Sequence, residues 1–143
     1  MATKKQITVQ VLIDEPIKKV WEAYTNPKHI VKWNFASNDW QCPSATNDLR
    51  VGGRFASRME SRDGGEGFDF GGKYTKVVPL KLIAYTMDGK DKRTASVEFE
   101  KVWESTNVRV SFDPEKENSL EMQKSGWQAI LENFKEYTEH IKG

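Results

Sequence analysis

The chain has 143 residues, a size typical of one folded domain that buries a substantial core without disulfides. Its 22 Lys and Arg residues nearly balance 21 Asp and Glu residues, and both signs are spread along the chain, which excludes the basic stripe of a nucleic-acid-binding protein. The mean hydropathy of -0.71 and the short apolar runs exclude a membrane-spanning helix. We therefore expect a single domain over residues 1–143, with no nucleic-acid partner and no membrane span.

The N-terminal residues indicate where the protein is located, and the few potential metal ligands indicate whether it binds a metal ion. Residues 1–5 are basic and lead directly into a strand pattern, without the apolar stretch of a signal peptide. Cys42 is the only cysteine, which fits a reducing compartment, so we expect a cytoplasmic protein. His29, His140 and Cys42 lack the close spacing of zinc ligands, and we expect neither a metal ion nor another cofactor.

The first elements in chain order are a strand and two short helices. Apolar residues at every second position of 6–13 predict a strand with one buried face. Pro16 and the apolar residues that follow it at i, i+3, i+4 and i+7 predict a helix over 16–24. Pro27 ends this helix and begins a second helical stretch over 27–33.

The middle of the chain has the pattern of an antiparallel sheet. Residues 34–49 show neither a strand nor a helix period and contain many turn formers, so we interpret them as an irregular loop. From 54 to 113 the sequence alternates between apolar and polar residues and predicts five or six strands. The turns between these strands are expected at Gly52-Gly53, 63–65, Pro79, 88–89 and 105–107.

The C-terminal segment carries the longest helical pattern. Asn118 followed by Glu121 resembles a capping box, and a stripe of large apolar side chains of about four turns follows it. Burying each side chain is worth roughly 1.5 to 3 kcal/mol, which favours docking of the helix across the sheet. Trp127 follows Gly126, where we expect the helix to approach the sheet closely. The stripe consists of Trp127, Ile130, Leu131, Phe134, Tyr137 and Ile141.

Several short motifs over nearly the whole chain resemble one family. They are PIKKVW (16–21), Trp33, DLRVGGRF (48–55), GKY (72–74), IAY (83–85) and GWQAILENF (126–134). The resemblance is to homologues of the activator of the heat-shock protein 90 ATPase, a branch of the START-like (SRPBCC) superfamily. It implies an α+β helix-grip fold: a curved antiparallel sheet of about six or seven strands wrapped around a long C-terminal helix, with two short helices after the first strand.

The resemblance also implies a cavity between sheet and helix, with an almost uncharged lining. Strand alternation places Asp69, Glu98 and Glu100 on the outer face, away from the apolar residues beside them. The inner face supplies large rings, a few polar groups that could orient a ligand, and two adaptable methionines. The ligand-binding candidates are Trp33, Trp40, Phe55, Ser57, Met59, Phe68, Phe70, Tyr74, Tyr85, Trp127 and Ile130.

Three functions remain open from the sequence. The first is binding of a small hydrophobic or aromatic molecule, such as a lipid or a polyketide-like metabolite, that enters beside residues 34–49. The second is a cyclase-like or aromatase-like enzyme with Tyr or Ser hydroxyls as acid and base, for which no catalytic pair stands out. The third is a domain that contacts a chaperone partner.

Two motifs have plainer interpretations. Residues 67–73 match the spacing of a phosphate-binding loop up to its lysine, but Tyr74 replaces the required Ser or Thr and the flanks alternate like strands. We therefore interpret this stretch as part of a hairpin. Cys42, beside Pro43, has no histidine near it in the sequence and is interpreted as a bystander thiol near the mouth of the pocket.

Overall fold

The computed structural model describes residues 6–141, so the basic residues 1–5 lie outside the described part of the chain. The order of elements is a strand, two short helices, six further strands and one long helix. They are β1 (Ile7–Ile13), α1 (Ile17–Thr25), α2 (Pro27–Trp33), β2 (Trp40–Asn47), β3 (Arg54–Ser61), β4 (Gly67–Val78), β5 (Leu82–Met87), β6 (Thr94–Val102), β7 (Ser105–Phe112) and α3 (Leu120–His140).

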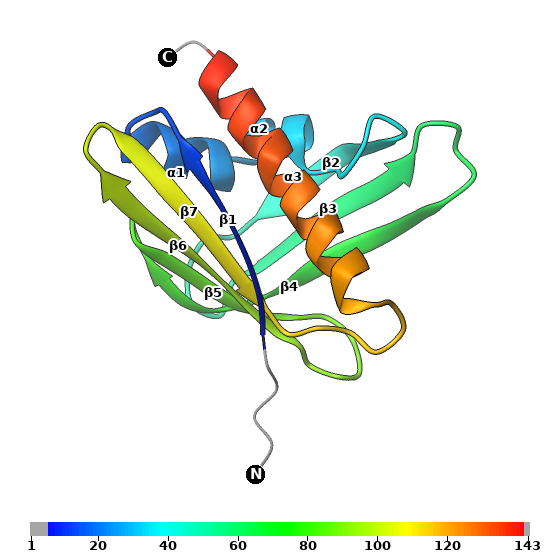
Figure 1. Cartoon of the computed structure of the whole chain (residues 1–143). Helices are drawn as coiled ribbons and strands as arrows, with labels where there is room; N and C mark the ends of the chain where they lie inside the picture. The colour runs from blue at the N-terminus through cyan, green and yellow to red at the C-terminus, as the bar shows by residue number, and fades with distance from the viewer. Residues whose placement is uncertain (1–5, 142–143) are drawn as a thin grey trace.

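The strands form one antiparallel seven-stranded sheet in the order β1-β7-β6-β5-β4-β3-β2. The sheet is strongly curved, and α3 lies diagonally across its open side while α1 and α2 lie beside the C-terminal half of α3 (Figure 1). This arrangement confirms the predicted helix-grip fold. The sheet and α3 are the two layers between which the core forms.

The strand register sets which side chains face α3. Ser57 lies opposite Phe70 across the β3–β4 pair, and Tyr74 lies opposite Tyr85 across the β4–β5 pair. Because side chains alternate along a strand, these residues share the concave face. Phe55 lies opposite Gly72, where a Cβ atom would come within 3.1 Å of the Phe55 ring, so the glycine makes room for that ring.

The other half of the sheet and the helices form a closely packed core. Alternating residues of β1, β6 and β7 are buried, and Phe134 of α3 is fully buried against them. The rings of Trp33 and Tyr24 lie 4.8 and 5.2 Å from that of Phe134 and pack edge to face on it. The predicted apolar stripe of α3 therefore docks on the sheet as expected.

The segment 34–49 differs from its prediction as a loop, because residues 40–47 form the edge strand β2. The pairing with β3 shifts register between Gln41 and Ser44, at Cys42 and Pro43. A proline has no N–H group to donate, and edge strands and bulges are where a sheet tolerates it. Residues 34–49 were interpreted as a loop because they contain many turn formers, although 40–47 form a strand that pairs on one side only.

Two further boundaries were predicted wrongly. The β6–β7 turn was expected at 105–107, but it lies at Trp103 and Glu104, with Trp103 at a φ of +58°. The N-cap of α3 was expected at Asn118, but it is Ser119, whose Oγ accepts a hydrogen bond of 3.1 Å from the backbone N–H of Met122. At α3 the hydroxyl of Ser119 takes the capping role that the motif assigned to Asn118.

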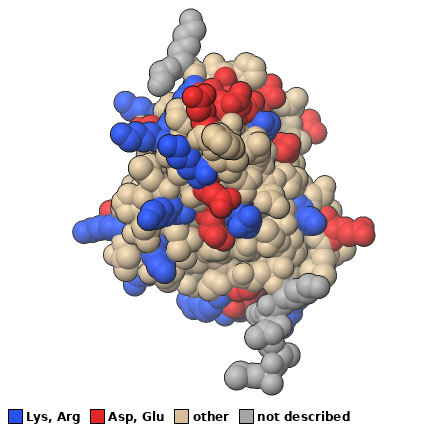
Figure 2. Space-filling model, turned by 60° about the vertical axis from the view of Figure 1, so that its left-hand side comes forward, with Lys and Arg blue, Asp and Glu red and all other residues tan. Residues whose placement is uncertain are grey.

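The acidic residues that alternation assigned to the outer face of the sheet lie on the surface. Asp69, Glu98 and Glu100 are exposed, and an oxygen of Asp69 lies 3.3 Å from Nη1 of Arg58. On the face shown in Figure 2, Lys and Arg side chains lie among Asp and Glu side chains. Within residues 6–141, no helix is long and apolar enough to cross a lipid bilayer.

Candidate functional site

A cavity of about 350 Å³ lies between the concave face of the sheet and α3. Its size lies within the range of roughly 300 to 1,000 Å³ that is usual for small-molecule sites. Most of its lining is aromatic or aliphatic. The lining residues are Tyr24, Thr25, Ile30, Trp33, Asn34, Thr46, Asn47, Phe55, Ser57, Met59, Phe68, Phe70, Tyr74, Ile83, Tyr85, Arg93, Val110, Glu115, Asn118, Gln123, Trp127, Ile130 and Leu131.

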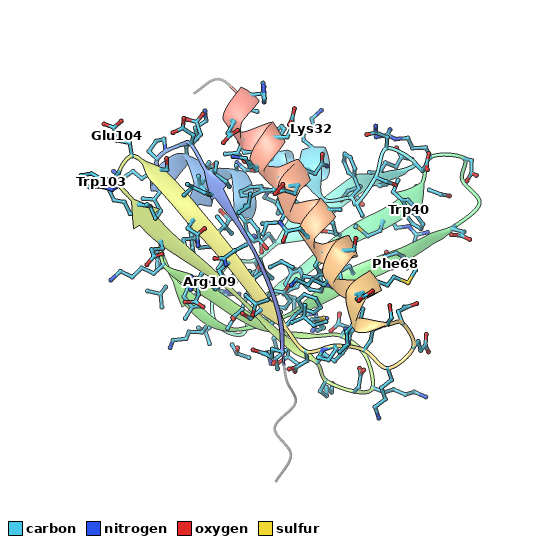
Figure 3. The ribbon with its side chains drawn as sticks, in the orientation of Figure 1. Lys32, Trp40, Phe68, Trp103, Glu104 and Arg109 are labelled. Atoms are coloured by element: carbon cyan, nitrogen blue, oxygen red, sulfur yellow. The ribbon has the colours of Figure 1, made fainter. Side chains whose placement is uncertain are left out.

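The structure brings ten of the eleven candidate residues together around this cavity, and Trp40 is the exception. Trp40 begins β2 and its ring lies 6.0 Å from that of Phe68 (Figure 3). It borders a separate hollow beside the β3–β4 turn. Trp40 pairs with Ser61 beside the β3–β4 turn, at the opposite end of β2 from Asn47, and does not line the cavity.

The aromatic rings pack against one another along the wall of the cavity. The Phe55 ring lies 4.8 Å from that of Tyr85, and the Phe70 ring lies 6.2 Å from that of Trp127, both edge to face. Trp127 also stacks on Phe112 at 3.9 Å. Such ring pairs hold each other in place, so the wall is shaped before a ligand arrives.

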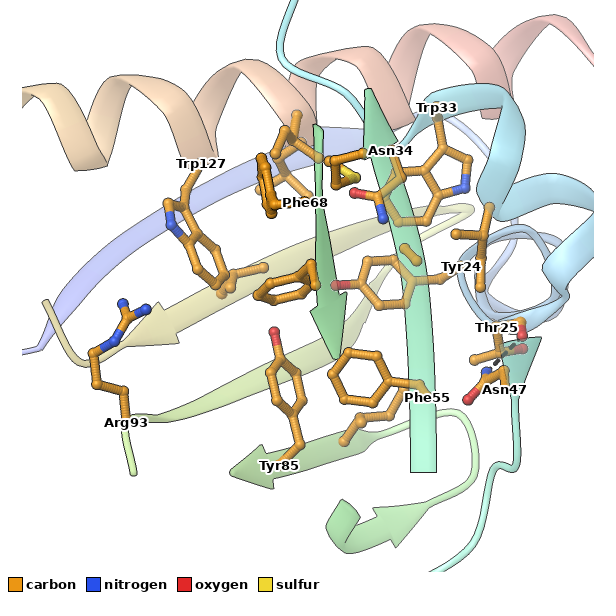
Figure 4. A pocket seen from close by; sticks show the side chains of 18 of the residues that line it. Tyr24, Thr25, Trp33, Asn34, Asn47, Phe55, Phe68, Tyr85, Arg93 and Trp127 are labelled. Atoms are coloured by element: carbon orange, nitrogen blue, oxygen red, sulfur yellow. Dashed lines mark hydrogen bonds between the residues drawn. The ribbon is translucent and has the colours of Figure 1, made fainter. Parts of the chain in front are cut away.

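The opening of the cavity is marked by Phe68. This residue lines the cavity and yet 50% of its surface is exposed. In Figure 4, Phe68 and Asn34 lie on the side of the cavity under α3, whereas Phe55 and Tyr85 lie on the opposite wall. A ligand therefore has access past Phe68, between the start of β4 and α3.

Three polar residues missed by the sequence reasoning form part of the site. The hydroxyl of Tyr74 donates a hydrogen bond to Oδ1 of Asn47, and Nδ2 of Asn47 donates one of 2.7 Å to the carbonyl of Thr25. Tyr24 also lines the cavity, and its ring points into it (Figure 4). Asn47 was missed because its segment was interpreted as a loop, and Tyr24 because its helical spacing with Val20 indicated core packing.

Burial controls the ionisation of the cavity tyrosines. It raises the pKa of Tyr24, of Tyr74 and of Tyr85 well above the usual value for a phenol. The mutual proximity of the phenols raises the pKa of Tyr85 further, and the positive charge of Arg93 offsets this only in part. All three side chains are therefore neutral phenols at neutral pH, and each hydroxyl can donate one hydrogen bond as well as accept.

Two charged residues, Arg93 and Glu115, are part of the lining. Arg93 lies beside Trp127 (Figure 4), and its Nε atom is 3.4 Å from Oδ2 of Asp91. Glu115 lines the same space, and its Oε1 accepts a hydrogen bond of 3.0 Å from the backbone N–H of Asn118. The positive and negative charges of the lining thus balance.

The described residues contain no candidate metal site, and their one thiol lies outside the cavity. Over 6–141, no group of three or more His, Cys, Asp or Glu side chains is arranged to hold a metal ion. Cys42 is buried in β2, does not line the cavity, and lies 3.4 Å from the carbonyl of Ser44. It was expected near the pocket mouth, and burial in the strand instead raises the pKa of its thiol. Residues 67–73 lie in β4, as the hairpin interpretation predicted.

The family described as Activator of Hsp90 ATPase homolog 1-like protein matches residues 14–139. The chain belongs to this family. A solution structure of an AHSA1-like protein from Aeromonas hydrophila is 38% identical, with a TM-score of 0.87 over 97% of this chain and 99% of that one. No curated protein matches the chain.

Other structures resemble this family member to different degrees. A protein from Cytophaga hutchinsonii is 45% identical, with a TM-score of 0.80 over 96% of this chain and 97% of that one. A protein from Nitrosomonas europaea is 20% identical, with a TM-score of 0.84 over 99% of both chains, and this likeness shows the fold alone. The same fold thus occurs in chains in which most side chains differ.

Proposed function

We propose that this protein is a cytoplasmic binding protein for a small hydrophobic or aromatic molecule, which occupies the cavity between the sheet and α3. The observation that carries the proposal is the aromatic cavity of about 350 Å³ with an opening at Phe68. Large apolar side chains in a domain usually pack until no space remains. Here the curved sheet and α3 leave a volume that these rings line and do not fill.

The lining favours binding over catalysis. The described lining residues include no His or Asp side chain that could act as a base beside the tyrosine and serine hydroxyls. The carboxylate of Glu115 accepts a hydrogen bond from the Asn118 backbone at the end of the cavity. The site therefore offers apolar contact area and hydrogen-bond donors, which are the features of a binding pocket.

The test is a titration of isotope-labelled protein with fatty acids, flavonoids and polyketide-like aromatics, followed by amide NMR. We expect saturable shifts at lining residues, around Phe70 and Trp127. Phe70→Asp places a charge in the apolar wall and should abolish binding, because an unpaired buried charge is strongly unfavourable. Val51→Asp, at a position 64% exposed, is the matched control and should bind normally.

A second variant distinguishes a loss of binding from a misfolding of Phe70→Asp. Ile130→Trp keeps the wall apolar but fills part of the cavity from α3, so it should weaken binding while the amide spectrum stays well dispersed. If none of the compounds binds at micromolar concentration, the proposal is wrong. Unchanged binding by both cavity variants would contradict it as well.

Contact with a chaperone is a second candidate, supported by the family description and by Trp103. This residue is 90% exposed at the tip of the β6–β7 turn, far from the cavity (Figure 3). An exposed tryptophan is typical of a protein contact site. Addition of this protein to purified Hsp90 should then raise the ATPase rate, and Trp103→Ala should remove the effect; an unchanged rate would contradict this candidate.

A further inference from the structure

The cavity tyrosines differ in whether their hydroxyls have a protein partner. Tyr74 donates to Oδ1 of Asn47. The hydroxyls of Tyr24 and Tyr85 form no hydrogen bond with any side chain or backbone group of residues 6–141. Two phenolic donors are thus left over in a mostly apolar space.

Both hydroxyls are accessible from the cavity. Within the described residues, every side-chain nitrogen or oxygen that is sealed from solvent has a hydrogen-bond partner. Tyr24 and Tyr85 have none, and so their oxygen atoms must be open to the space between the sheet and α3. Tyr85 itself is only 7% exposed, which means that the cavity is what reaches its hydroxyl.

The two phenols approach the cavity from different elements. Tyr24 projects from α1, and Tyr85 projects from β5 in the sheet. In Figure 4 the oxygen atoms of both residues point toward the middle of the cavity. The electrostatic influence of Tyr24 on the pKa of Tyr85 fits this convergence. A ligand in the middle of the cavity therefore meets both hydroxyls.

We propose that Tyr24 and Tyr85 together donate hydrogen bonds to one carbonyl oxygen of the ligand. This inference rests on the proposed function, and it narrows the ligand class to neutral aromatic or aliphatic ketones and related carbonyl compounds. An acceptor is required because each phenol carries an O–H proton that no group of residues 6–141 accepts, and a hydrocarbon would leave both donors unpaired. A carbonyl oxygen has two lone pairs and can accept from both.

The charges of the lining favour a neutral carbonyl over a carboxylate. Arg93 is already beside Asp91, and Glu115 contributes a negative charge to the same space. A carboxylate in the cavity would lose its hydration without gaining an unpaired cation. A ketone oxygen needs only the two donors that the structure leaves free.

The experiment compares two probes of nearly the same shape: benzophenone, and the hydrocarbon gem-diphenylethylene, in which a methylene group replaces the ketone oxygen. Dissociation constants are measured for the wild type, Tyr24→Phe and Tyr85→Phe. Each hydroxyl lost should weaken benzophenone binding roughly three- to tenfold, the usual range for one hydrogen bond. Hydrocarbon binding should stay within about twofold, because the rings remain.

Tyr137→Phe is the control, since the Tyr137 hydroxyl pairs with Nδ1 of His29 at 2.6 Å and Tyr137 does not line the cavity. It should change neither affinity. A second readout is the carbonyl stretching frequency of bound benzophenone, which should rise toward its value in an apolar solvent in each phenol variant. This frequency shift reports directly on hydrogen bonds to the carbonyl oxygen. It would not occur if the two tyrosines only supported the fold of the protein.

The outcomes separate the two proposals. Weaker binding of both probes to the same extent, or an unchanged carbonyl frequency, would overturn the two-donor site while leaving the cavity as a binding site. Failure of both probes to bind the wild type would overturn both proposals. Selective weakening of the ketone in both variants supports the inference.

Discussion

At the scale of single residues, the hydrogen-bonding state of each phenol decides what its hydroxyl contributes. The hydroxyl of Tyr74 is bound to Asn47, which in turn holds the carbonyl at the end of α1, so this hydroxyl connects three elements. That of Tyr85 has no partner within residues 6–141. The first is therefore structural and the second is free for a ligand.

Tyr74→Phe should lower the free energy of unfolding by about 1 to 3 kcal/mol, because it leaves Oδ1 of Asn47 without its donor in a partly buried place. Tyr85→Phe is the matched control and should change stability by less than about 0.5 kcal/mol, since no protein hydrogen bond is lost. Urea unfolding followed by circular dichroism measures both. Equal losses in the two variants would contradict this division of roles.

At the scale of elements, α3 closes the cavity, and its sequence contains a glycine that its packing does not explain. A Cβ atom added at Gly126 would meet no atom within 4 Å, so the glycine does not permit the close approach of helix to sheet that the sequence suggested. By contrast, a Cβ atom at Gly72 of β4 would lie 2.4 Å from the carbonyl oxygen of Thr86.

Gly126→Ala should raise the free energy of unfolding by roughly 0.5 to 1 kcal/mol, because alanine loses less conformational entropy within a helix than glycine does. Thermal or urea unfolding tests this gain. Gly72→Ala should instead destabilise the protein through a backbone clash. A loss of stability in Gly126→Ala would show that α3 lies closer to the sheet than described above.

At the scale of the whole molecule, the buried phenols couple folding to alkaline pH. Burial raises the pKa of Tyr24, Tyr74 and Tyr85 in the folded protein, whereas the unfolded chain has the ordinary value of about 10. Below that pH both states are protonated and the stability is fully present. Above it the unfolded chain releases phenolic protons first, which favours unfolding.

The free energy of unfolding should therefore fall above about pH 10, by as much as 1.4 kcal/mol per pH unit for each buried phenol. Urea unfolding at a series of alkaline pH values measures this slope. Tyr85→Phe should reduce the dependence of the free energy of unfolding on pH by the contribution of one phenol. This difference separates the contribution of the tyrosines from that of the lysines, which the variant leaves unchanged. An identical slope in wild type and variant would contradict the assignment.

The sequence by itself determined the elements whose patterns are local. The alternation in β1 and β3–β7 and the apolar stripe of α3 predicted an antiparallel sheet with a helix docked across it, because burying one face of each element is strongly favourable. The curvature of the sheet around the helix was implied by the resemblance to the family. Seven of the predicted cavity residues lie on strands and followed from that alternation, since side chains such as Phe55 and Phe70 share a face whatever the exact turns.

Tertiary structure alone decided the remainder. Residues 40–47 became a strand because β3 offered them a partner along one edge, which local turn propensity does not reveal. Tyr24 lines the cavity because α1 packs at the end of the cavity. Asn47 lines it because β2 pairs with β3 at the edge of the sheet. Whether rings fill a space or line it depends on the curvature of the sheet and the position of α3, which are properties of the packed whole.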